Sequence, residues 1–567
     1  MREHDSTVAE PGTRKPSTGN PTALRRRRGA TRLAGVFGRL GVPTFEWAGV
    51  VFIMLLAAVA RFVNLPARGI WDSDQGFELG AIWNAVQTHQ LPIYGSPAFT
   101  TGPAFHHGAL FYDLLIPVSW ISQGNPTVMV VEIVLFGLAV VPLVWWTARS
   151  IGGTAAGLAA ALLTAVSPAL IDNSTFLWNP TLVEPGAALA CFGAWQAWRT
   201  RDARWWVVAA AGTALASQSH LTGLVLLFPM AALFLVDLRR GPAKTRRRLA
   251  AWGIAGVGLF VLTWLPWIVN ELSHGFVETR AMLQFSQDGP PALDPFSRLF
   301  IGFTRVLAYP FTSWPLNGVL AGLPAALAAA TAIVAGMIWR LTGAFARRRD
   351  GSAVVDGSSL ERQGLTFVVG SIVLMTTILA LVIRAVSQFS DLNQEQYHSV
   401  VDVFAILAAG LLVSGLWRAR PLKRRPNSGR AVAVVVLTCL VAVGVANWPP
   451  LTAADGGWPA AQSAAQRLEN DAGGRDVALV ALPTFISGDA YGYPLKLDGY
   501  RLVDPAGSGT LIVLCYPSWA HKWSLGDCGG AAESAWIASN LSGRRYSRVD
   551  EWQPAPDRVL SVYRLSP

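Results

Sequence analysis

The chain has 567 residues, of which 52% are hydrophobic and only 14% are charged, and its mean hydropathy is +0.37. A soluble globular domain carries about 25% charged residues, so this composition predicts a polytopic membrane protein. The formal net charge of +11 comes from Lys and Arg gathered in the N-terminal tail and in short loops between apolar segments. Cytoplasmic segments of membrane proteins show this pattern, so the positive charge does not indicate nucleic acid as a partner.

The first 43 residues are polar, basic and rich in Pro, Gly, Ser and Thr, and they lack the apolar core of a signal peptide. They predict a disordered cytoplasmic tail. Apolar runs of about 20 residues, long enough to span a bilayer, then follow in the domain that we expect over residues 44–448. These runs lie near 44–64, 127–148, 153–171, 181–199, 249–270, 317–339, 364–384, 398–417 and 430–448.

The stretch 204–237 is too long for a single spanning helix and has basic residues at both ends. Two short helices joined by a turn at Gln218-Ser219-His220 would place both basic ends on the same side of the membrane. The sequence therefore predicts a helical hairpin here.

The segment 107–122 decides the topology. As a helix it would reach only about 24 Å, and it contains Asp113 and Pro117. If it crosses the membrane, every later basic loop lies outside; if it rests on the outer surface, all of them lie inside, as the charge rule requires. We therefore predict 11 spans in the plasma membrane, a cytoplasmic N-terminus and an external C-terminus.

Residues 449–567 differ from the rest of the chain. Short β-rich runs at 477–480, 511–514 and 559–563 alternate with Gly, Pro and Asp turns, and 458–470 has the pattern of a helix. A small extracytoplasmic α/β domain is expected. Its two cysteines, Cys515 and Cys528, would form a disulfide in that compartment, with two free thiols as the alternative.

The first external loop, 65–126, carries the most informative motif. Trp71-Asp72-Ser73-Asp74-Gln75-Gly76 follows the first span, and an amphipathic stretch, 77–86, comes next. A turn over 101–108, which contains His106 and His107, then leads into the surface segment. Two carboxylates at a membrane surface carry a desolvation cost, which points to a use for them.

This order resembles the membrane glycosyltransferases of the GT-C fold, in particular the branch of protein O-mannosyltransferases and lipid A aminoarabinose transferases. Those proteins carry an Asp-Glu pair where this chain has Asp74-Gln75, and a His-Pro-Pro-Leu-type turn near Gly102–His107. Trp178-Asn179-Pro180 is similar to their second external loop, although the Arg and Asp often found there are missing. Gln218-Ser219-His220 and Glu395-Gln396-Tyr397-His398 are similar to positions that face the cavity. The resemblance covers residues 44–448.

The resemblance implies transfer of a hexose or pentose from a polyprenyl-monophosphate donor to a hydroxyl of a glycan, glycolipid or protein, with inversion at the anomeric carbon. Asp74 is predicted as the general base because it matches the family acid, and Asp72 is the second candidate. Substrate contacts are predicted for Gln75, His106, His107, Asn179, His220, Arg280, Arg384 and Tyr397. Arg61 is a further candidate for the phosphate. There is no CxxC pair, HExxH motif or Gly-rich phosphate loop, so no metal site and no cofactor are predicted, although a divalent ion stays open.

Other interpretations of these residues stay open at this point. Asp72 or Asp74 could cap the helix that starts near Gly76, since Asp is a favoured N-cap residue. His106 and His107 could rest at the interface, and His220 could satisfy the tight turn of the hairpin. Arg280 could be a solvated loop residue, and Arg61 and Arg384 could reach lipid headgroups. A lipid or solute transporter would share the many spans, and a non-catalytic envelope assembly protein would use the external domain instead.

Overall fold

The computed structural model describes residues 43–98, 105–240, 242–287, 294–313, 336, 357–382, 397–419 and 427–566. The chain divides into two compact units between Val51 and Phe52. The described part of the first unit is the beginning of helix α2 (Thr44–Phe62), and everything below concerns the second unit. The tail predicted for residues 1–43 and the span predicted near 317–339 lie almost entirely outside the described residues.

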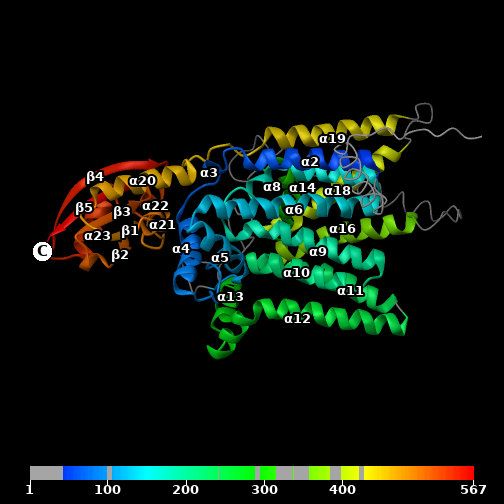
Figure 1. Ribbon diagram of the computed structural model, residues 1–567, viewed down its shortest axis with the longest axis horizontal. Coiled ribbons are helices and arrows are strands. Elements are labelled where there is room, and N and C mark those ends of the chain that lie inside the picture. The colour runs from blue at the N-terminus through cyan, green and yellow to red at the C-terminus, as the bar shows by residue number, and fades with distance from the viewer. Residues whose placement is uncertain are drawn as a thin grey trace, which may run out of the picture. The chain divides into compact units, whose positions relative to one another are not determined.

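Within the described residues, seven helices are long and apolar enough to cross a membrane. Besides α2, they are α6 (Pro126–Gly152), η2 (Leu221–Leu226) continued by α11 (Leu227–Arg240), α12 (Ala243–Ser273), α16 (Gly357–Leu381), α18 (Ser399–Arg418) and α19 (Ser428–Ala446). The shorter α7 (Thr154–Val166), α9 (Val183–Thr200) and α10 (Trp205–Ser219) run alongside them (Figure 1). The predicted polytopic helical fold is confirmed, while the count of 11 spans stays a prediction.

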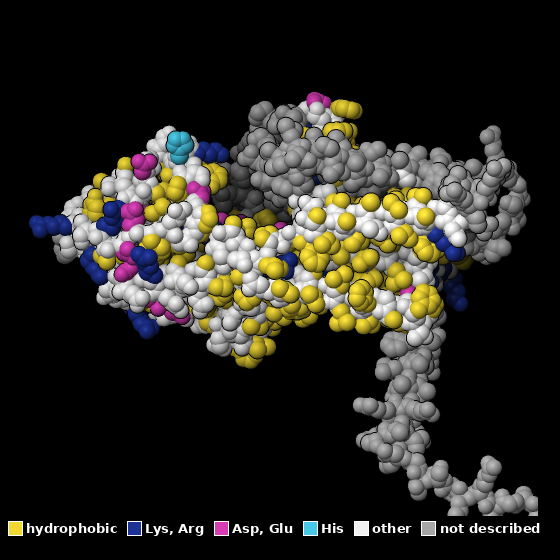
Figure 2. Space-filling model, turned by 90° about the horizontal axis from the view of Figure 1, so that it is seen from above, with side chains coloured by type: hydrophobic (Ala, Val, Ile, Leu, Met, Phe, Trp, Pro, Cys, Tyr) yellow, Lys and Arg dark blue, Asp and Glu magenta, His cyan; other side chains and the backbone are white. Residues whose placement is uncertain are grey.

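The surface of the protein has an apolar part and a polar part. Hydrophobic side chains cover the helical part, whereas most of the visible Lys, Arg, Asp and Glu side chains gather over the C-terminal part (Figure 2). Exposed apolar residues such as Leu135, Ile254 and Val435 would cost free energy in water but are stable against lipid. This surface fits a bundle embedded in a bilayer.

The core of the bundle is built around α18, most of whose residues are fully buried. Small residues bring its neighbours together. In the α9–α10 pair, a Cβ at Gly193 would lie 2.5 Å from the backbone nitrogen of Ala209, and a Cβ at Gly186 would lie 2.5 Å from that of Ala216. Glycine at these positions lets the two helix backbones pack closely, as is common in membrane bundles.

The predicted hairpin over 204–237 is confirmed, because α10 ends at Ser219 and the chain turns at His220 before η2 and α11. The span predicted near 153–171 is interrupted. It consists of α7 and a short α8 (Pro168–Asp172), because Pro168 breaks the helix and the Ser167 hydroxyl caps the next one through the Leu170 amide, at 3.3 Å.

Short helices gather at one end of the bundle (Figure 1). The first loop forms α3 (Leu65–Arg68), α4 (Ser73–Thr88) and α5 (Leu110–Ser122), and η1 (Asn179–Leu182) lies in the second loop. At 13 residues α5 is about 20 Å long, too short to span a bilayer. The stretch between the runs predicted near 249–270 and 317–339 contains two helices for which no prediction was made, α13 (Val277–Gln287) and α14 (Pro295–Thr312).

The predicted C-terminal α/β domain is confirmed. Its five-stranded sheet has the order β2-β1-β3-β5-β4, with β1 parallel to β2 and β3, and β5 antiparallel to β3 and β4. The completely buried β3 lies at the centre. The strands are β1 (Asp476–Leu482), β2 (Arg501–Leu502), β3 (Thr510–Cys515), β4 (Arg545–Ala555) and β5 (Arg558–Ser566).

Four helices cover this sheet: α20 (Gly457–Asp471), α21 (Asp489–Leu497), α22 (Pro517–Lys522) and α23 (Ala531–Asn540). The helix predicted at 458–470 corresponds to α20. Cys515 and Cys528 form the predicted disulfide, which ties the end of β3 to the segment before α23. Cys191 is buried within the bundle, and Cys439 is a free thiol on α19.

We expect a maleimide reagent to modify two cysteines of the denatured, unreduced protein and all four after reduction. Only Cys191 and Cys439 carry free thiols, because the other two are joined. Mass spectrometry of the intact labelled protein measures the number. Four labels before reduction, in protein prepared from membranes, would contradict both the disulfide and the oxidising compartment that it requires.

Candidate functional site

The motif at the start of α4 folds as a helix cap. Asp72 is extended, and its Oδ1 accepts a hydrogen bond from the Ser73 amide at 2.7 Å. The Gln75 side chain returns the interaction, since its Oε1 accepts from the Asp72 amide at 2.9 Å. Such a capping box satisfies backbone groups that the helix leaves unpaired. Asp72 therefore takes the capping role that the sequence left open, and the buried Gln75 is part of the same cap.

Asp74 lies in the first turn of α4 but takes no part in the cap. Its side chain is exposed and forms no hydrogen bond or ion pair with any described residue. Desolvation by the surrounding protein, with a smaller contribution from the charge of Asp72, raises the pKa of the Asp74 carboxyl to about 6. At neutral pH this carboxylate is ionised, accessible and more basic than an ordinary aspartate, which suits a general base.

A second acid, Glu78, lies one turn further along α4 and was not predicted. It is only 1% exposed, and neither carboxyl oxygen makes a hydrogen bond of normal geometry with the described residues. Burial raises its pKa to about 8, although Tyr112, Ser96 and the Asn179 backbone favour its charged form. Glu78 therefore holds its proton at neutral pH. The spacing of four residues from Asp74, which places both on one helix face, could have indicated it.

Three of the predicted site residues, His107, His220 and Tyr397, come from separate loops, and their rings lie next to one another in a row. The rings of His107 and His220 lie 4.7 Å apart, and the rings of His220 and Tyr397 lie 5.2 Å apart. Backbone contacts fix the row: His107 Nδ1 accepts from the Leu221 amide at 3.3 Å. Burial, followed by the positive charges that His220 and His106 could carry, lowers the pKa of His107 well below its usual value. His107 is thus a neutral hydrogen-bonding group.

Asn179 connects this row to α4. Its Nδ2 donates to the Ser219 carbonyl at 2.7 Å, beside His220, and its backbone faces Glu78. The Gln218 Oε1 accepts from the Leu110 amide at 3.1 Å and so joins α5 to the same turn. A continuous set of contacts therefore runs from Glu78 to the hairpin turn.

His106 points elsewhere than its neighbour. Its backbone amide donates to Glu278 Oε2 at 2.6 Å, its ring Nδ1 lies 3.0 Å from Glu278 Oε1, and Tyr94 stacks on the ring at 4.9 Å. His106 thereby attaches the first loop to α13. Arg280 is exposed on the same helix, and its charge acts on Glu271. Arg384 lies outside the described residues.

Arg61 near the end of α2 is completely buried. Its Nε donates to the Ser174 hydroxyl at 2.9 Å, and its Nη1 donates to the Ala57 carbonyl at 3.2 Å. The bond to Ser174 holds the loop between α8 and η1 against α2. These contacts do not place the guanidinium at the surface, as an arginine that reaches lipid headgroups would require.

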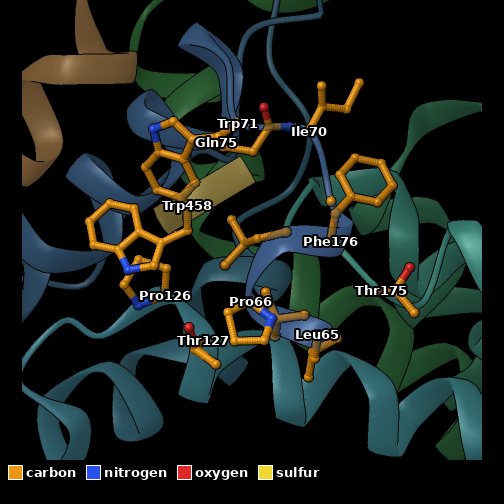
Figure 3. A pocket seen from close by; sticks show the side chains of 13 residues that line it. Leu65, Pro66, Ile70, Trp71, Gln75, Pro126, Thr127, Thr175, Phe176 and Trp458 are labelled. Atoms are coloured by element: carbon orange, nitrogen blue, oxygen red, sulfur yellow. The ribbon is translucent and has the colours of Figure 1, made fainter. Parts of the chain in front are cut away.

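A pocket of about 320 Å³ opens beside the start of α4 (Figure 3). The Trp71 and Trp458 rings, 4.5 Å apart, form one side of it. Its lining is mainly apolar and comes from the first two loops, the start of α6 and α20: Leu65, Pro66, Gly69, Ile70, Trp71, Gln75, Pro126, Thr127, Val130, Thr175, Phe176, Leu177 and Trp458. An apolar surface thus lies next to the capped acid motif.

Residues 116–267 match the family model described as dolichyl-phosphate-mannose-protein mannosyltransferase. Among solved structures, ArnT from Cupriavidus metallidurans bound to undecaprenyl phosphate gives a TM-score of 0.52 at 14% identity, over 92% of this chain and 98% of that one. Apo ArnT from the same organism gives 0.50 at 15% identity, over 90% and 97%. The oligosaccharyltransferase of Archaeoglobus fulgidus gives 0.47 at 13% identity, over 88% and 68%. No curated protein sequence matches the chain.

The two ArnT structures share the fold of this chain over nearly its whole length, so the predicted GT-C fold is confirmed. The matched family model is that of a glycosyltransferase, the class of enzyme expected from the sequence. It covers part of the helical bundle and does not reach the α4 motif.

The packing of α4 against α21 gives a prediction about stability. A Cβ at Gly76 would overlap the backbone carbonyl of Asp489, whereas a Cβ at Gly80 would meet only the tip of Lys496, at 3.9 Å. Gly76→Ala should therefore lower the free energy of unfolding by about 1–3 kcal/mol, and the matched control Gly80→Ala should leave it unchanged or slightly raised. Thermal unfolding in detergent measures both. Equal melting temperatures for the two variants would contradict the close contact.

Proposed function

We propose that this GT-C-fold protein is a glycosyltransferase that moves a sugar from a polyprenyl-monophosphate donor to an acceptor hydroxyl at the outer face of the plasma membrane. The observation that carries the proposal is the exposed, unpaired carboxylate of Asp74 at the start of the helix that follows the first span. The ArnT structure of the same fold is bound to undecaprenyl phosphate, which supports a lipid-phosphate donor.

In the proposed reaction, the acceptor oxygen attacks the anomeric carbon and the bond from that carbon to the phosphate oxygen breaks. The phosphate leaves with the bonding electrons, and Asp74 takes the proton of the acceptor hydroxyl. One displacement of this kind inverts the anomeric centre. Asp74 suits the role because desolvation keeps the pKa of its carboxyl near the working pH, where a base is most effective.

Glu78 supports this role by staying neutral. If Glu78 were also ionised, its negative charge would raise the pKa of Asp74 further, and Asp74 would become protonated at a higher pH. Because burial holds the proton on Glu78, with a pKa of about 8, Asp74 ionises alone. The buried acid thus leaves the exposed one free to act.

We assign substrate contacts to His107, His220 and Tyr397, the row that joins three loops. Gln75, His106 and Asn179 make hydrogen bonds within the protein, which favours a supporting role for them. The predicted orientation, with a cytoplasmic N-terminus and an external C-terminal domain, places this end of the bundle outside. The Cys515–Cys528 disulfide supports that placement.

Asp74→Asn should lower the transfer rate by about 10²- to 10⁴-fold, because the amide cannot accept the proton. Asp72→Asn is the comparison variant: it keeps the proposed base and, because Asn also caps helices, the helix start, so its loss of rate should be much smaller. Product formation is measured by mass spectrometry in proteoliposomes supplied with polyprenyl-phosphate sugars. Wild-type transfer by Asp74→Asn would rule out the proposed base, and movement of substrate without transfer would instead indicate a transporter.

The pH dependence of transfer should have an acidic limb with a midpoint near pH 6, where Asp74 gains its proton and activity is lost. Asp72→Asn removes a negative charge that raises the pKa of Asp74, so its midpoint should shift to lower pH. Glu78→Gln should leave this limb nearly in place, because Glu78 is already neutral there. Initial rates between pH 5 and pH 8 give the midpoints. An unshifted limb in Asp72→Asn would contradict the coupling of the two acids.

A further inference from the structure

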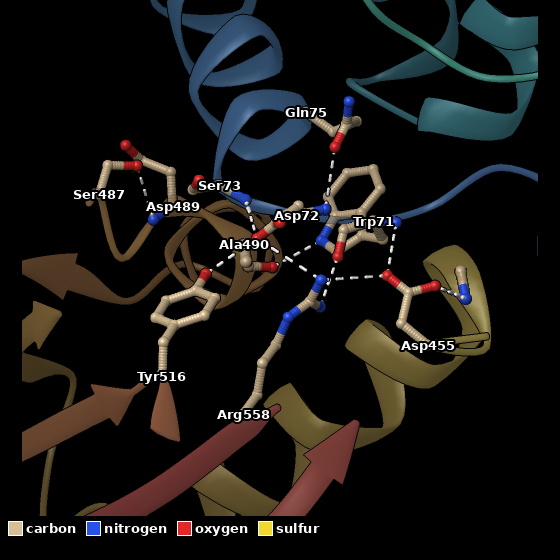
Figure 4. Close-up of polar contacts among 11 residues, drawn as sticks. Trp71, Asp72, Ser73, Gln75, Asp455, Ser487, Asp489, Ala490, Tyr516 and Arg558 are labelled. Carbon is tan, nitrogen blue, oxygen red and sulfur yellow. Dashed lines mark hydrogen bonds and ion pairs between the residues drawn. The ribbon is translucent and has the colours of Figure 1, made fainter. Parts of the chain in front are cut away.

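Arg558, the first residue of β5, reaches out of the C-terminal domain to the α4 motif (Figure 4). Its Nη1 donates to the Trp71 carbonyl at 2.6 Å. Its Nη2 pairs with Asp455 Oδ2 at 3.2 Å and with Asp72 Oδ1 at 3.5 Å. Arg558 is only 6% exposed, and the side chain of Asp455 is also buried, whereas the side chain of Asp72 is 43% exposed. The guanidinium itself is therefore buried, and one of its two carboxylate partners still meets solvent. The guanidinium of Arg558 thus binds both Trp71 and the N-cap residue Asp72 that follows it.

Trp71 is held from several directions by the same domain. Its indole Nε1 donates to the Ala490 carbonyl at 2.6 Å, and its backbone amide donates to Asp455 Oδ2 at 2.8 Å. Its ring packs on Trp458 at 4.5 Å and near Tyr493 at 6.1 Å. The backbone entering α4 is therefore fixed before the helix begins.

Asp72 receives a second contact from the domain besides Arg558, because the Tyr516 hydroxyl donates to Asp72 Oδ1 at 2.8 Å. Tyr516 follows Cys515 directly, so the disulfide anchors the strand end that presents it. On the other side of the helix, Gly76 lies against the backbone of Asp489 at the start of α21. Contacts from β3, β5, α21 and the loop before α20 thus surround the first turn of α4.

Burying an arginine with two carboxylates adds little net stability, because the desolvation cost offsets much of the attraction. Such a group instead fixes geometry, since any other arrangement leaves a buried charge unpaired. Although burial opposes its charge, Asp72 holds the pKa of Arg558 above its ordinary value. The arginine therefore stays charged at neutral pH.

We propose that Arg558 is a positioning residue for the transfer reaction, through which the C-terminal domain holds Asp72 and thereby orients Asp74 two residues later. The inference rests on the proposed function and gives a role to residues 449–567. The positive charge of Arg558 also compensates that of Asp72, so Asp74 meets less negative charge. Besides Asp455 and Tyr516, the charged or titratable groups that the described residues place about this turn are Glu78 on α4, Tyr112 on α5, and three residues of α21: Tyr491, which interacts with Arg558 and Asp72, and Asp489 and Lys496, which pair at 3.4 Å.

The test compares Arg558→Ala and Arg558→Lys with Arg501→Ala. Arg501 is the matched control, because it also forms a domain Arg–Asp pair, with Asp476 at 2.7 Å, but on the exposed surface near β2. We expect kcat of Arg558→Ala to fall about 10- to 100-fold with the donor KM nearly unchanged, since a displacement of the order of 1 Å has such an effect. Arg558→Lys should recover part of the loss, and Arg501→Ala should behave like the wild type.

The pH profile separates positioning from simple attachment of the domain. In Arg558→Ala the acidic limb should move to higher pH, because the charge of Asp72 is no longer compensated. In the double variant Arg558→Ala/Asp72→Asn both charges are gone, and the limb should return to the wild-type position or below it. Wild-type kinetics in Arg558→Ala, or a loss of rate with an unmoved limb, would overturn the proposal.

Hydrogen exchange measured by mass spectrometry tests the contact without any activity. Backbone amides of residues 73–78 should exchange faster in Arg558→Ala than in the wild type, and at the wild-type rate in Arg501→Ala. If no variant, including the wild type, transfers sugar, the proposed function fails while faster exchange still supports the contact. Unchanged exchange in Arg558→Ala would overturn the inference even if Asp74→Asn abolishes transfer.

Discussion

The arrangement at the α4 end of the bundle depends on the carboxylate of Asp72. It caps α4, accepts from Tyr516 and pairs with Arg558, so one oxygen joins the first loop to the C-terminal domain. Asp72 is thus engaged in contacts within the protein, and the exposed Asp74 is the acid that an acceptor can reach. The different roles of the two aspartates follow from helix geometry. The side chain of the N-cap residue, Asp72, meets the unpaired amides at the helix start, whereas the side chain of Asp74, in the first turn, points away from the helix axis.

The environment of α4 also separates its two remaining acids. Asp74 faces solvent at the helix start, and Glu78 lies one turn deeper among Tyr112, Ser96 and the backbone of Asn179. Two ionised carboxylates on one helix face would repel each other, so one of the two groups is expected to keep its proton. Burial decides that this group is Glu78, because the desolvation cost of ionising it exceeds the stabilisation that its polar neighbours give to the charged form. An accessible base and a proton-holding acid on one helix are a common arrangement for acid–base chemistry.

The parts of the fold that repeat a local physical rule could be predicted. Apolar runs predicted the spanning helices, the charge pattern predicted the hairpin at His220, and short β-rich runs between turns predicted β1, β3 and β5. The cap at Asp72 was left open as an alternative, although the Asp72–Gln75 spacing of a capping box is a local signal for it. Glu78 was missed, although its four-residue spacing from Asp74 is also a local signal. The contacts of Arg558 have no local signal, since the partners lie 487 residues apart in the chain. The depth of Glu78 likewise depends on α5 and η1, which only the folded structure brings together.

The same separation along the chain has a consequence for biogenesis. At about 5–20 residues per second, the ribosome makes Arg558 about 25 to 100 s after Trp71. During that interval the first loop has been made without its partners from the domain, so the Trp71 indole and the start of α4 lack the contacts that Ala490, Asp455 and Tyr516 later supply. The acid motif is thus among the first parts of the protein to be synthesised and among the last to be completed. If the proposed function and the proposed role of Arg558 hold, a nascent chain has little activity until the final hairpin of the sheet has formed.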